Sequence, residues 1–295
     1  MKKRFLPYYI VDVFAENRYS GNQLAVFIKP TGLSDAEMQQ IAHEINYAET
    51  TFVLSDKQED GGYQVRIFTP VEEVPFAGHP TLGTAYVIRE IMEQSNSQTI
   101  DLNLKVGQIP VNIDEPNLWM RQINPSFGNH LTIETMADVL GLNSTDFDEQ
   151  FPIEAVSTGL PFYMVPLKNL AAVKKAKVDR PKWLKVLAQY PQSAKMMLVF
   201  SPETYRPEND LNCRMFGEEL GVIEDAATGS ANGCFLAWLL KNNYFGKTDL
   251  TLSIEQGYEM NRPSLLLHKG KKVDAHTFDI NIGGQVQLVA EGKWY

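Results

Sequence analysis

The chain has 295 residues, of which 44% are hydrophobic and 21% charged, the composition of an ordinary soluble globular protein of about two domains. Its formal net charge of −9 argues against nucleic acid or an anionic membrane surface as the main partner. Two cysteines are too few for a disulfide scaffold, and no apolar run approaches the ~20 residues of a membrane span. We therefore expect a cytoplasmic protein that binds neither nucleic acid nor membrane.

The first part of the chain is predicted to contain short strands and two helices. Runs of β-branched and aromatic residues bounded by turn-forming residues indicate the strands. These runs cover residues 8–14, 24–28, 50–54, 63–69, 99–104, 108–113 and 118–122. Ser34 is expected to cap an amphipathic helix with apolar residues at helical spacing from Met38 to Ile45. A second, almost wholly apolar helix is expected after Gly83, extending to about Glu93.

The second part of the chain follows an irregular stretch at 116–128, which is rich in Pro, Asn and Gly. We place a domain boundary in this stretch, with a first domain at 1–118 and a second at 119–283. The strands predicted beyond it cover residues 153–157, 162–167, 195–200, 212–216, 249–256, 264–268, 278–283 and 285–290. The helices predicted there cover residues 133–140 and 182–189, together with a long apolar helix that ends near Asn243.

The same short pattern precedes both apolar helices. Residues 76–83 and 225–232 each combine glycine with small polar residues. A helix that is apolar all round must be buried all round, so we expect a sheet curled around a central helix, made twice. A helix start exposes unpaired N–H groups and a partial positive charge. Two such starts therefore predict a carboxylate or similar anion held between the two halves.

Glu49 is the first candidate for chemistry. It lies between the amphipathic helix and an apolar strand, where partial burial would raise its pKa toward the range useful for proton transfer. A solvent-facing glutamate at a helix end remains the alternative. His79 precedes Pro80 and is expected in the first turn of its helix, where the helix dipole lowers its pKa and keeps the ring neutral. A capping histidine without chemistry is the alternative there.

The second glycine pattern supplies Asp225 and Ser230, which flank a turn. Thr228 or Ser230 is expected to cap the helix, and Gly229 would let a ligand approach the backbone. Capping alone also explains these residue types. The five histidines show no metal-ligand spacing, so no metal site is expected.

Taken together, the motifs resemble those of the PhzF-like family of isomerases, which is related in fold to diaminopimelate epimerase. The resemblance spans nearly the whole chain. It rests on Val11–Phe14 with Gly21-Asn22, on Glu49–Phe52, Arg66–Pro70, Gly78–Gly83 and Glu224-Asp225 with Thr228–Ala231, on Gln256-Gly257 with Arg262–Ser264, and on Gly283–Val286. In such a protein the last residues, about 284–295, join the first domain.

The resemblance implies an α+β fold of two similar domains, each a curled, mostly antiparallel, barrel-like sheet around a central apolar helix, with the active site in the cleft between them. It assigns the proton transfer to Glu49, with His79, Asp225 and Ser230 assisting. Gly78, Thr228, Gly229 and Asn22 are then expected to bind a small carboxylate-bearing substrate. The resemblance also implies that no cofactor is used and that the protein is a homodimer.

Three positions depart from the family pattern. Gln23 stands where the family usually has proline, Ala48 replaces a frequent serine, and Asn261 replaces a glycine. None of these removes a residue that handles protons, but all three leave the identity of the substrate open.

Two other functions remain open at this point. A racemase with two opposed thiols is disfavoured because Ala77 and Thr228, not cysteines, precede the two glycines. Cys213 and Cys234 are expected to be packing residues. A one-base amino-acid epimerase or tautomerase is the enzymatic alternative. The alternative from another class is a non-catalytic metabolite-binding protein that keeps the cleft.

Overall fold

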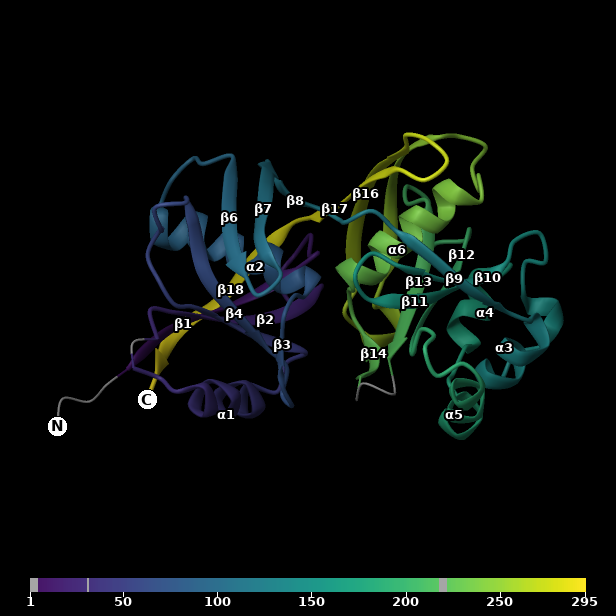
Figure 1. Ribbon diagram of the computed structural model, residues 1–295, viewed down its shortest axis with the longest axis horizontal. Helices are drawn as coiled ribbons and strands as arrows, with labels where there is room; N and C mark the ends of the chain where they lie inside the picture. Colours follow the sequence, from purple (N-terminus) through teal and green to yellow (C-terminus); the bar gives the residue numbers. More distant parts are fainter. Residues whose placement is uncertain (1–4, 31, 218–221) are drawn as a thin grey trace. The chain divides into compact units, whose positions relative to one another are not determined.

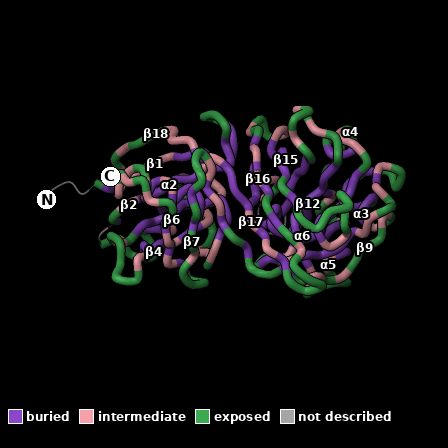
Figure 2. Tube along the Cα trace, turned by 90° about the horizontal axis from the view of Figure 1, so that it is seen from above, coloured by how far each residue is buried: buried purple, intermediate pink, exposed green. Residues whose placement is uncertain are grey.

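The computed structural model describes residues 5–30, 32–217 and 222–295, and the chain divides into two compact units (Figure 1). The first is Met1–Arg121 with Gly283–Tyr295, and the second is Gln122–Ile282. Buried segments concentrate inside each unit, and exposed segments lie mainly in its loops (Figure 2). The predicted fold class, α+β with a curled sheet around an apolar helix in each of two similar domains, is confirmed by the pairings below.

In the first unit a sheet wraps around helix α2 (Gly78–Val87). The strands are β1 (Leu6–Val13), β2 (Asn22–Ile28), β3 (Glu49–Val53), β4 (Gly62–Phe68), β5 (Glu73–Val74), β6 (Thr99–Leu104), β7 (Gly107–Asp114), β8 (Asn117–Arg121) and β18 (Val286–Trp294). They pair in the order β18, β1, β2, β3, β4, β6, β7, β8, with β5 beside β4. Because α2 contacts β18 and β1 as well as β7 and β8, the sheet must curl.

The second unit repeats this arrangement around helix α6 (Gly229–Lys241). Its strands are β9 (Ser126–Leu131), β10 (Ile153–Ser157), β11 (Pro161–Pro166), β12 (Met196–Ser201), β13 (Leu211–Gly217), β14 (Val222–Asp225), β15 (Asp249–Gln256) and β16 (Ser264–Lys272), and β17 (Phe278–Gly284) leads back into the first unit. The pairing order is β9, β10, β11, β12, β13, β15, β16, with β14 beside β13. Helix α6 contacts β10 and β11 near one end of this order and β16 at the other.

The two sheets share one sequence of connections. In the first unit, parallel β2 and β3 are joined through α1 (Asp35–Ile45), and parallel β4 and β6 are joined through α2. In the second unit, parallel β11 and β12 are joined through α4 (Leu170–Lys175) and α5 (Arg180–Gln189), and parallel β13 and β15 through α6. The remaining pairs are antiparallel in both units. In both units the central helix therefore forms the second of the two crossovers between parallel strands.

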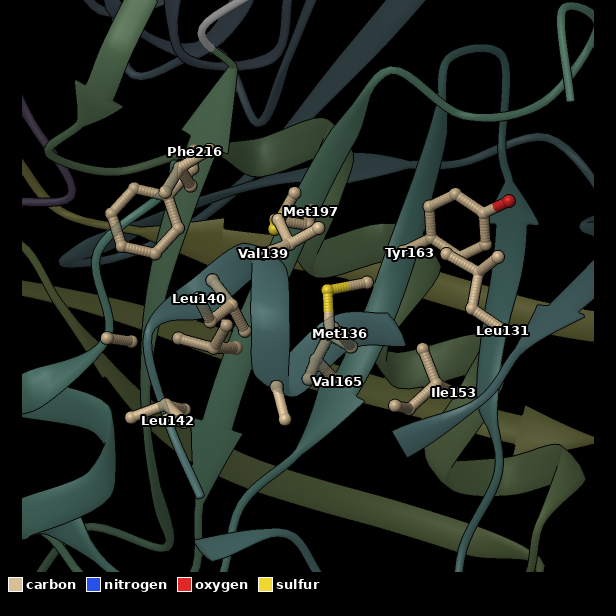
Figure 3. Close-up of a cluster of buried hydrophobic side chains, with 14 of the residues drawn as sticks. Leu131, Met136, Val139, Leu140, Leu142, Ile153, Tyr163, Val165, Met197 and Phe216 are labelled. Carbon is tan, nitrogen blue, oxygen red and sulfur yellow. The ribbon is translucent and has the colours of Figure 1, made fainter. Parts of the chain in front are cut away.

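Outer helices cover the other face of each sheet. In the first unit, Met38, Ile41 and Ala42 of α1 pack in one cluster with Phe27 and Phe52. In the second unit, α3 (Ile133–Leu140) packs on the strands through Met136, Val139 and Leu140, which Figure 3 shows beside side chains of β9 to β13. Apolar burial on both faces of the sheet accounts for the apolar runs in the sequence.

Helix α2 begins at Gly78, earlier than the start after Gly83 that the apolar run predicts, whereas α6 begins at Gly229, directly after the predicted cap residue Thr228. Gly83 and Gly233 lie in the second turn of their helices, where each helix packs very closely against neighbouring side chains. A Cβ on Gly83 would lie 2.6 Å from Leu24 Cδ2, and one on Gly233 would lie 2.9 Å from Gln122 Cγ. Packing thus outweighs the low helix propensity of glycine. Beyond Val87 the first helix continues as a π-helix, η1 (Ile88–Glu93).

The sequence analysis missed several short elements. Strand β9 lies within and just beyond the stretch that was predicted to be irregular, because it is an edge strand of mostly polar residues that pairs with β10. Strands β5 and β14 and helix α4 were also missed, as were the short 3-10 turns η2 (Ser144–Asp146) and η4 (Tyr258–Met260). Each has at most six residues, too few to show a periodic pattern.

Among the described residues, no helix combines the length and apolar character needed to cross a membrane.

Candidate active site

Three predicted residues of the first unit lie together. Glu49 is the first residue of β3, and His79 is the second residue of α2. His79 Nε2 lies 3.5 Å from Glu49 Oε2, and His79 Nδ1 lies 3.2 Å from Asn22 Nδ2. The Glu49 side chain is 20% exposed, so it is not the solvent-facing glutamate of the alternative interpretation.

The local sequence explains how these residues meet. Helix α1 ends at Asn46, whose left-handed conformation (φ 56°) turns the chain into β3. Asn22 opens β2 directly after Gly21, which has φ 66° and lies so close to Val13 that a Cβ would be 2.3 Å from the Val13 carbonyl oxygen. Strands β2 and β3 are parallel neighbours, with Leu24 opposite Glu49. The sheet register therefore brings the amide and the carboxylate to the same region.

His79 is neutral over the physiological range. Burial lowers its pKa from 6.5 to about 3, and a hydrogen bond with the Gln23 backbone acts weakly in the opposite direction. The predicted direction of the shift is confirmed, but its main cause is burial and not the helix dipole. The ring lies between the Asn22 amide, on the Nδ1 side, and the Glu49 carboxylate, on the Nε2 side. The contact thus joins a carboxylate to a neutral imidazole.

The predicted residues of the second unit form another group. Asp225 is the last residue of β14, Thr228 is the N-cap of α6, and Gly229 and the buried Ser230 are the first two residues of that helix. Thr228 Oγ1 donates a hydrogen bond to Asp225 Oδ2 at 2.6 Å. The hydroxyl is therefore directed at the carboxylate and not at the helix. Thr228 is the N-cap residue of α6, as predicted, but α6 has no side-chain cap from it or from Ser230.

Both central helices begin without a side-chain cap. The N-cap residues Ala77 and Thr228 accept no hydrogen bond from their helices. By contrast, the outer helices α1, α3, α4 and α5 are each capped by a serine, threonine, asparagine or aspartate side chain. Backbone N–H groups at the start of α2 and α6 are thus left for another acceptor.

A residue without a predicted role connects the second group. Gln256, at the end of β15, contacts both Asp225 and Thr228. The sequence signal that was available was the Gln256-Gly257 motif, which the analysis noted without giving it a function. Nothing in the local sequence shows what a glutamine side chain in a strand will contact.

Both cysteines are buried packing residues, as predicted. Cys213 and Cys234 are 0% exposed. Burial raises the pKa of the Cys213 thiol well above its ordinary value and that of Cys234 to about 11. Neither therefore carries the thiolate that a two-thiol racemase requires. Within the described part of the chain, no group of three or more His, Cys, Asp or Glu residues is arranged to hold a metal ion.

Comparison with known proteins gives a consistent result over the full length. A family model for "Phenazine biosynthesis-like protein" matches residues 11–292. The trans-2,3-dihydro-3-hydroxyanthranilate isomerase of Pseudomonas aeruginosa is 31% identical, with 98% of this chain and 99% of the relative covered. An uncharacterized isomerase of Pasteurella multocida is 32% identical, with 98% and 93% covered.

Solved structures show the same similarity. A phenazine biosynthesis protein of the PhzF family from Bacillus anthracis superposes with a TM-score of 0.89 at 28% identity, with 99% of each chain covered. A hydroxyproline epimerase from Agrobacterium vitis superposes with a TM-score of 0.63 at 10% identity, with 99% of this chain and 93% of the other covered. The second likeness concerns the fold alone, and it confirms the predicted epimerase-like fold.

Proposed function

Because the chain belongs to the phenazine biosynthesis-like family, whose named relatives include isomerases, we propose that it is a cofactor-independent isomerase of a small carboxylate-bearing metabolite. Glu49 is the single acid/base of this reaction and moves a proton from one carbon atom of the substrate to another. The observation that carries the proposal is the half-buried Glu49 carboxylate against the buried, neutral His79 ring.

The chemistry needs one group that both removes and returns a proton. Glu49 takes a proton from carbon while the C–H electron pair moves into the adjoining π-system, and the protonated Glu49 then delivers that proton to a different carbon. His79 Nε2 is buried and has no hydrogen-bond partner among the described residues, so it is available to the substrate. The uncapped starts of α2 and α6 supply N–H donors for the substrate carboxylate and for charge that develops during the reaction.

The difference between the two units favours a single base. The second residue of the central helix is His79 in the first unit and Ser230 in the second. Strand β3 begins with Glu49, whereas its counterpart β12 begins with Met196. The shared fold therefore has a glutamate beside a histidine in one unit and hydroxyl groups with Asp225 in the other, which supports a single base. That these groups act on one substrate remains a prediction of the sequence analysis.

The first experiment follows trans-2,3-dihydro-3-hydroxyanthranilate in D₂O by proton NMR, with wild type, Glu49→Gln and Glu44→Gln. Glu44 is an exposed glutamate of α1 and serves as the matched control. We expect wild type and Glu44→Gln to convert the compound, and Glu49→Gln to be slower by about 10²- to 10⁴-fold, the usual contribution of general acid/base catalysis. Binding of the compound should persist in Glu49→Gln.

The other outcomes separate the alternatives. Deuterium incorporation at one carbon without a shift of the double bonds would identify a one-base epimerase. Tight binding of small carboxylates by wild type with no turnover of any of them would favour a metabolite-binding protein. Equal turnover by wild type and Glu49→Gln would reject Glu49 as the proton carrier.

A further inference from the structure

Gln256, the last residue of β15, makes hydrogen bonds to both Asp225 and Thr228. Gln256 Nε2 donates to the Asp225 carbonyl oxygen at 2.9 Å and to Thr228 Oγ1 at 3.0 Å. Gln256 Oε1 accepts from the Thr228 backbone N–H at 3.2 Å and from Asn232 Nδ2 at 2.9 Å. All four hydrogen-bonding positions of this amide are occupied, which makes it a complete buried network.

The partners of Gln256 settle the orientation of its amide. The Thr228 backbone N–H can only donate, so it must face Oε1, and the Asp225 carbonyl can only accept, so it must face Nε2. Because Nε2 then donates to Thr228 Oγ1, the single hydroxyl proton of Thr228 is directed elsewhere. It points to Asp225 Oδ2, 2.6 Å away.

From this geometry we propose that Gln256 is a positioning residue that acts through Thr228, holding the Asp225 carboxylate as a hydrogen-bond acceptor in a defined place for the reaction. The inference rests on the proposed function of Asp225. Gln256 itself is buried at 0% exposure, and its side chain is bonded to the groups it orients.

The side chains that hydrogen-bond the amide are neutral. Asn232 Nδ2 also bonds the Thr228 carbonyl oxygen at 3.0 Å, and Asn232 Oδ1 lies 2.9 Å from His268 Nε2. Burial lowers the pKa of His268 to about 3, so the ring is neutral. The Cys213 thiol, 3.8 Å from Gln256 Oε1, is kept protonated because burial raises its pKa. Glu224, beside Asp225, is paired with Arg214 at 2.8 Å.

The backbone beyond Gln256 reinforces the same segment. Gly257 has φ 78° and packs so closely that a Cβ would lie 2.5 Å from the Ala226 carbonyl oxygen. Ser264 Oγ donates to that carbonyl oxygen at 3.0 Å. The motif that includes Gln256, Gly257 and Ser264 therefore holds the turn between Asp225 and Thr228 from one side.

The test replaces only the donor half of the amide. In Gln256→Glu the oxygen that accepts from the Thr228 N–H and from Asn232 remains. The ionised carboxylate cannot donate a hydrogen bond to Thr228 Oγ1, and it competes with Asp225 for the hydroxyl proton of Thr228. Gln122→Glu is the matched control, since Gln122 is a buried glutamine next to α6 that contacts Gly233 and neither Asp225 nor Thr228. A second variant, Thr228→Val, removes the hydroxyl that donates to Asp225.

Two readouts distinguish positioning from simple structural support. The first is the titration of the Asp225 carboxyl carbon by ¹³C NMR in the folded protein, assigned with Asp225→Asn. Its midpoint should move to higher pH in Gln256→Glu and Thr228→Val, because a carboxylate that loses a donor is less stable in its charged form. The second is kcat of Gln256→Glu, which should fall by about 10- to 100-fold as the pH rises and residue 256 ionises, with KM nearly unchanged.

The outcomes separate this inference from the proposed function. If the Asp225 midpoint moves in Gln256→Glu and Thr228→Val but the wild-type protein shows no isomerase turnover, the positioning role is retained and the proposed function is rejected. A folded Gln256→Glu protein with the wild-type Asp225 midpoint and pH profile would overturn the positioning role, whatever the turnover. Equal changes in Gln122→Glu would also overturn it, since they would show a general effect of a buried charge.

Discussion

Each of the two candidate carboxylates, Glu49 and Asp225, is linked to a side-chain amide through one intermediate residue. Asn22 contacts His79, which faces Glu49, and Gln256 contacts Thr228, which donates to Asp225. In both cases an uncharged amide orients the group that contacts the carboxylate. A carboxylate held in a defined orientation is suited to accepting a proton from carbon.

The two buried histidines predict loss of stability in mild acid. Burial lowers the pKa of His79 and His268 from 6.5 to about 3. Between these values the unfolded chain binds a proton at each histidine and the folded chain does not, so the free energy of unfolding falls as the pH falls below 6.5. From pH 7 to pH 5 we expect a loss of about 2 kcal/mol for each histidine, measured by urea unfolding.

His268→Gln provides the control for this prediction. A glutamine can still donate to Asn232 Oδ1, the partner of His268 Nε2, but does not titrate. The slope of the unfolding free energy against pH between 6 and 5 should decrease by about 1.4 kcal/mol per pH unit in this variant. An unchanged slope would show that His268 is not responsible for the acid sensitivity.

At the scale of elements, capping distinguishes two kinds of helix. The outer helices are closed by polar side chains, whereas α2 and α6 begin at glycines without a side-chain cap. An uncapped, buried helix start is unfavourable unless another acceptor reaches it, and in α6 the Thr228 N–H is taken by Gln256. The same starts carry the residues assigned to substrate binding. The two helices therefore lack the stabilisation of a side-chain cap at the ends where we expect a ligand to bind.

The turn after β15 predicts that two glycines differ in how much stability is lost when each is replaced by alanine. Gly257→Ala places a Cβ 2.5 Å from the carbonyl oxygens of Ala226 and Arg262, on a backbone with φ 78°. Gly246→Ala has a similar φ of 68° but open space around it. We expect Gly246→Ala to lower the free energy of unfolding by about 1 kcal/mol and Gly257→Ala by about 2–4 kcal/mol.

Turnover supplies a second comparison for these glycine variants. The clash at Gly257 is with the segment that holds Asp225 and Thr228, so Gly257→Ala should lose activity under conditions where it is fully folded. Gly246→Ala should keep wild-type activity. Similar unfolding midpoints and similar activities of the two variants would contradict the close packing described for Gly257.

At the scale of the whole molecule, one chain arrangement is used twice with different chemistry. The order of antiparallel and parallel pairs, and the central helix as a crossover, agree between the units. The side chains do not agree, since Glu49 and His79 have Met196 and Ser230 at the corresponding strand and helix starts. The repeat accounts for two similar helix starts, and the divergence is consistent with the single proton carrier that we propose.

The proposal that Glu49 and Asp225 act on one substrate predicts non-additive kinetics. If Glu49 and Asp225 act on the same substrate in one step, Glu49→Gln and Asp225→Asn together should be little slower than Glu49→Gln alone. Single-turnover rates of the two single variants and the double variant, with substrate binding measured separately, provide the test. Multiplicative losses, or full activity of folded Asp225→Asn, would show that the two groups do not serve one reaction step.

Much of the fold could be predicted from local patterns. Ser34 caps its helix as predicted, and the apolar helices are buried at the centre of their sheets. The errors concern short or exceptional elements. The apolar run placed the start of α2 too late, after Gly83, because glycines usually interrupt helices, whereas here close contact between helix and sheet requires Gly83.

The sequence by itself determined the repeated sheet and helix pattern, the family, and the residue types available at Glu49, His79, Asp225 and Ser230. Only the tertiary structure decided their partners, because Asn22 and His79 are 57 positions apart and Gln256 and Thr228 are 28 apart. Periodicity and propensity report on neighbours within a few residues, whereas a buried hydrogen bond depends on sheet register. Desolvation of His79, which keeps its ring neutral, likewise arises only when the chain is packed.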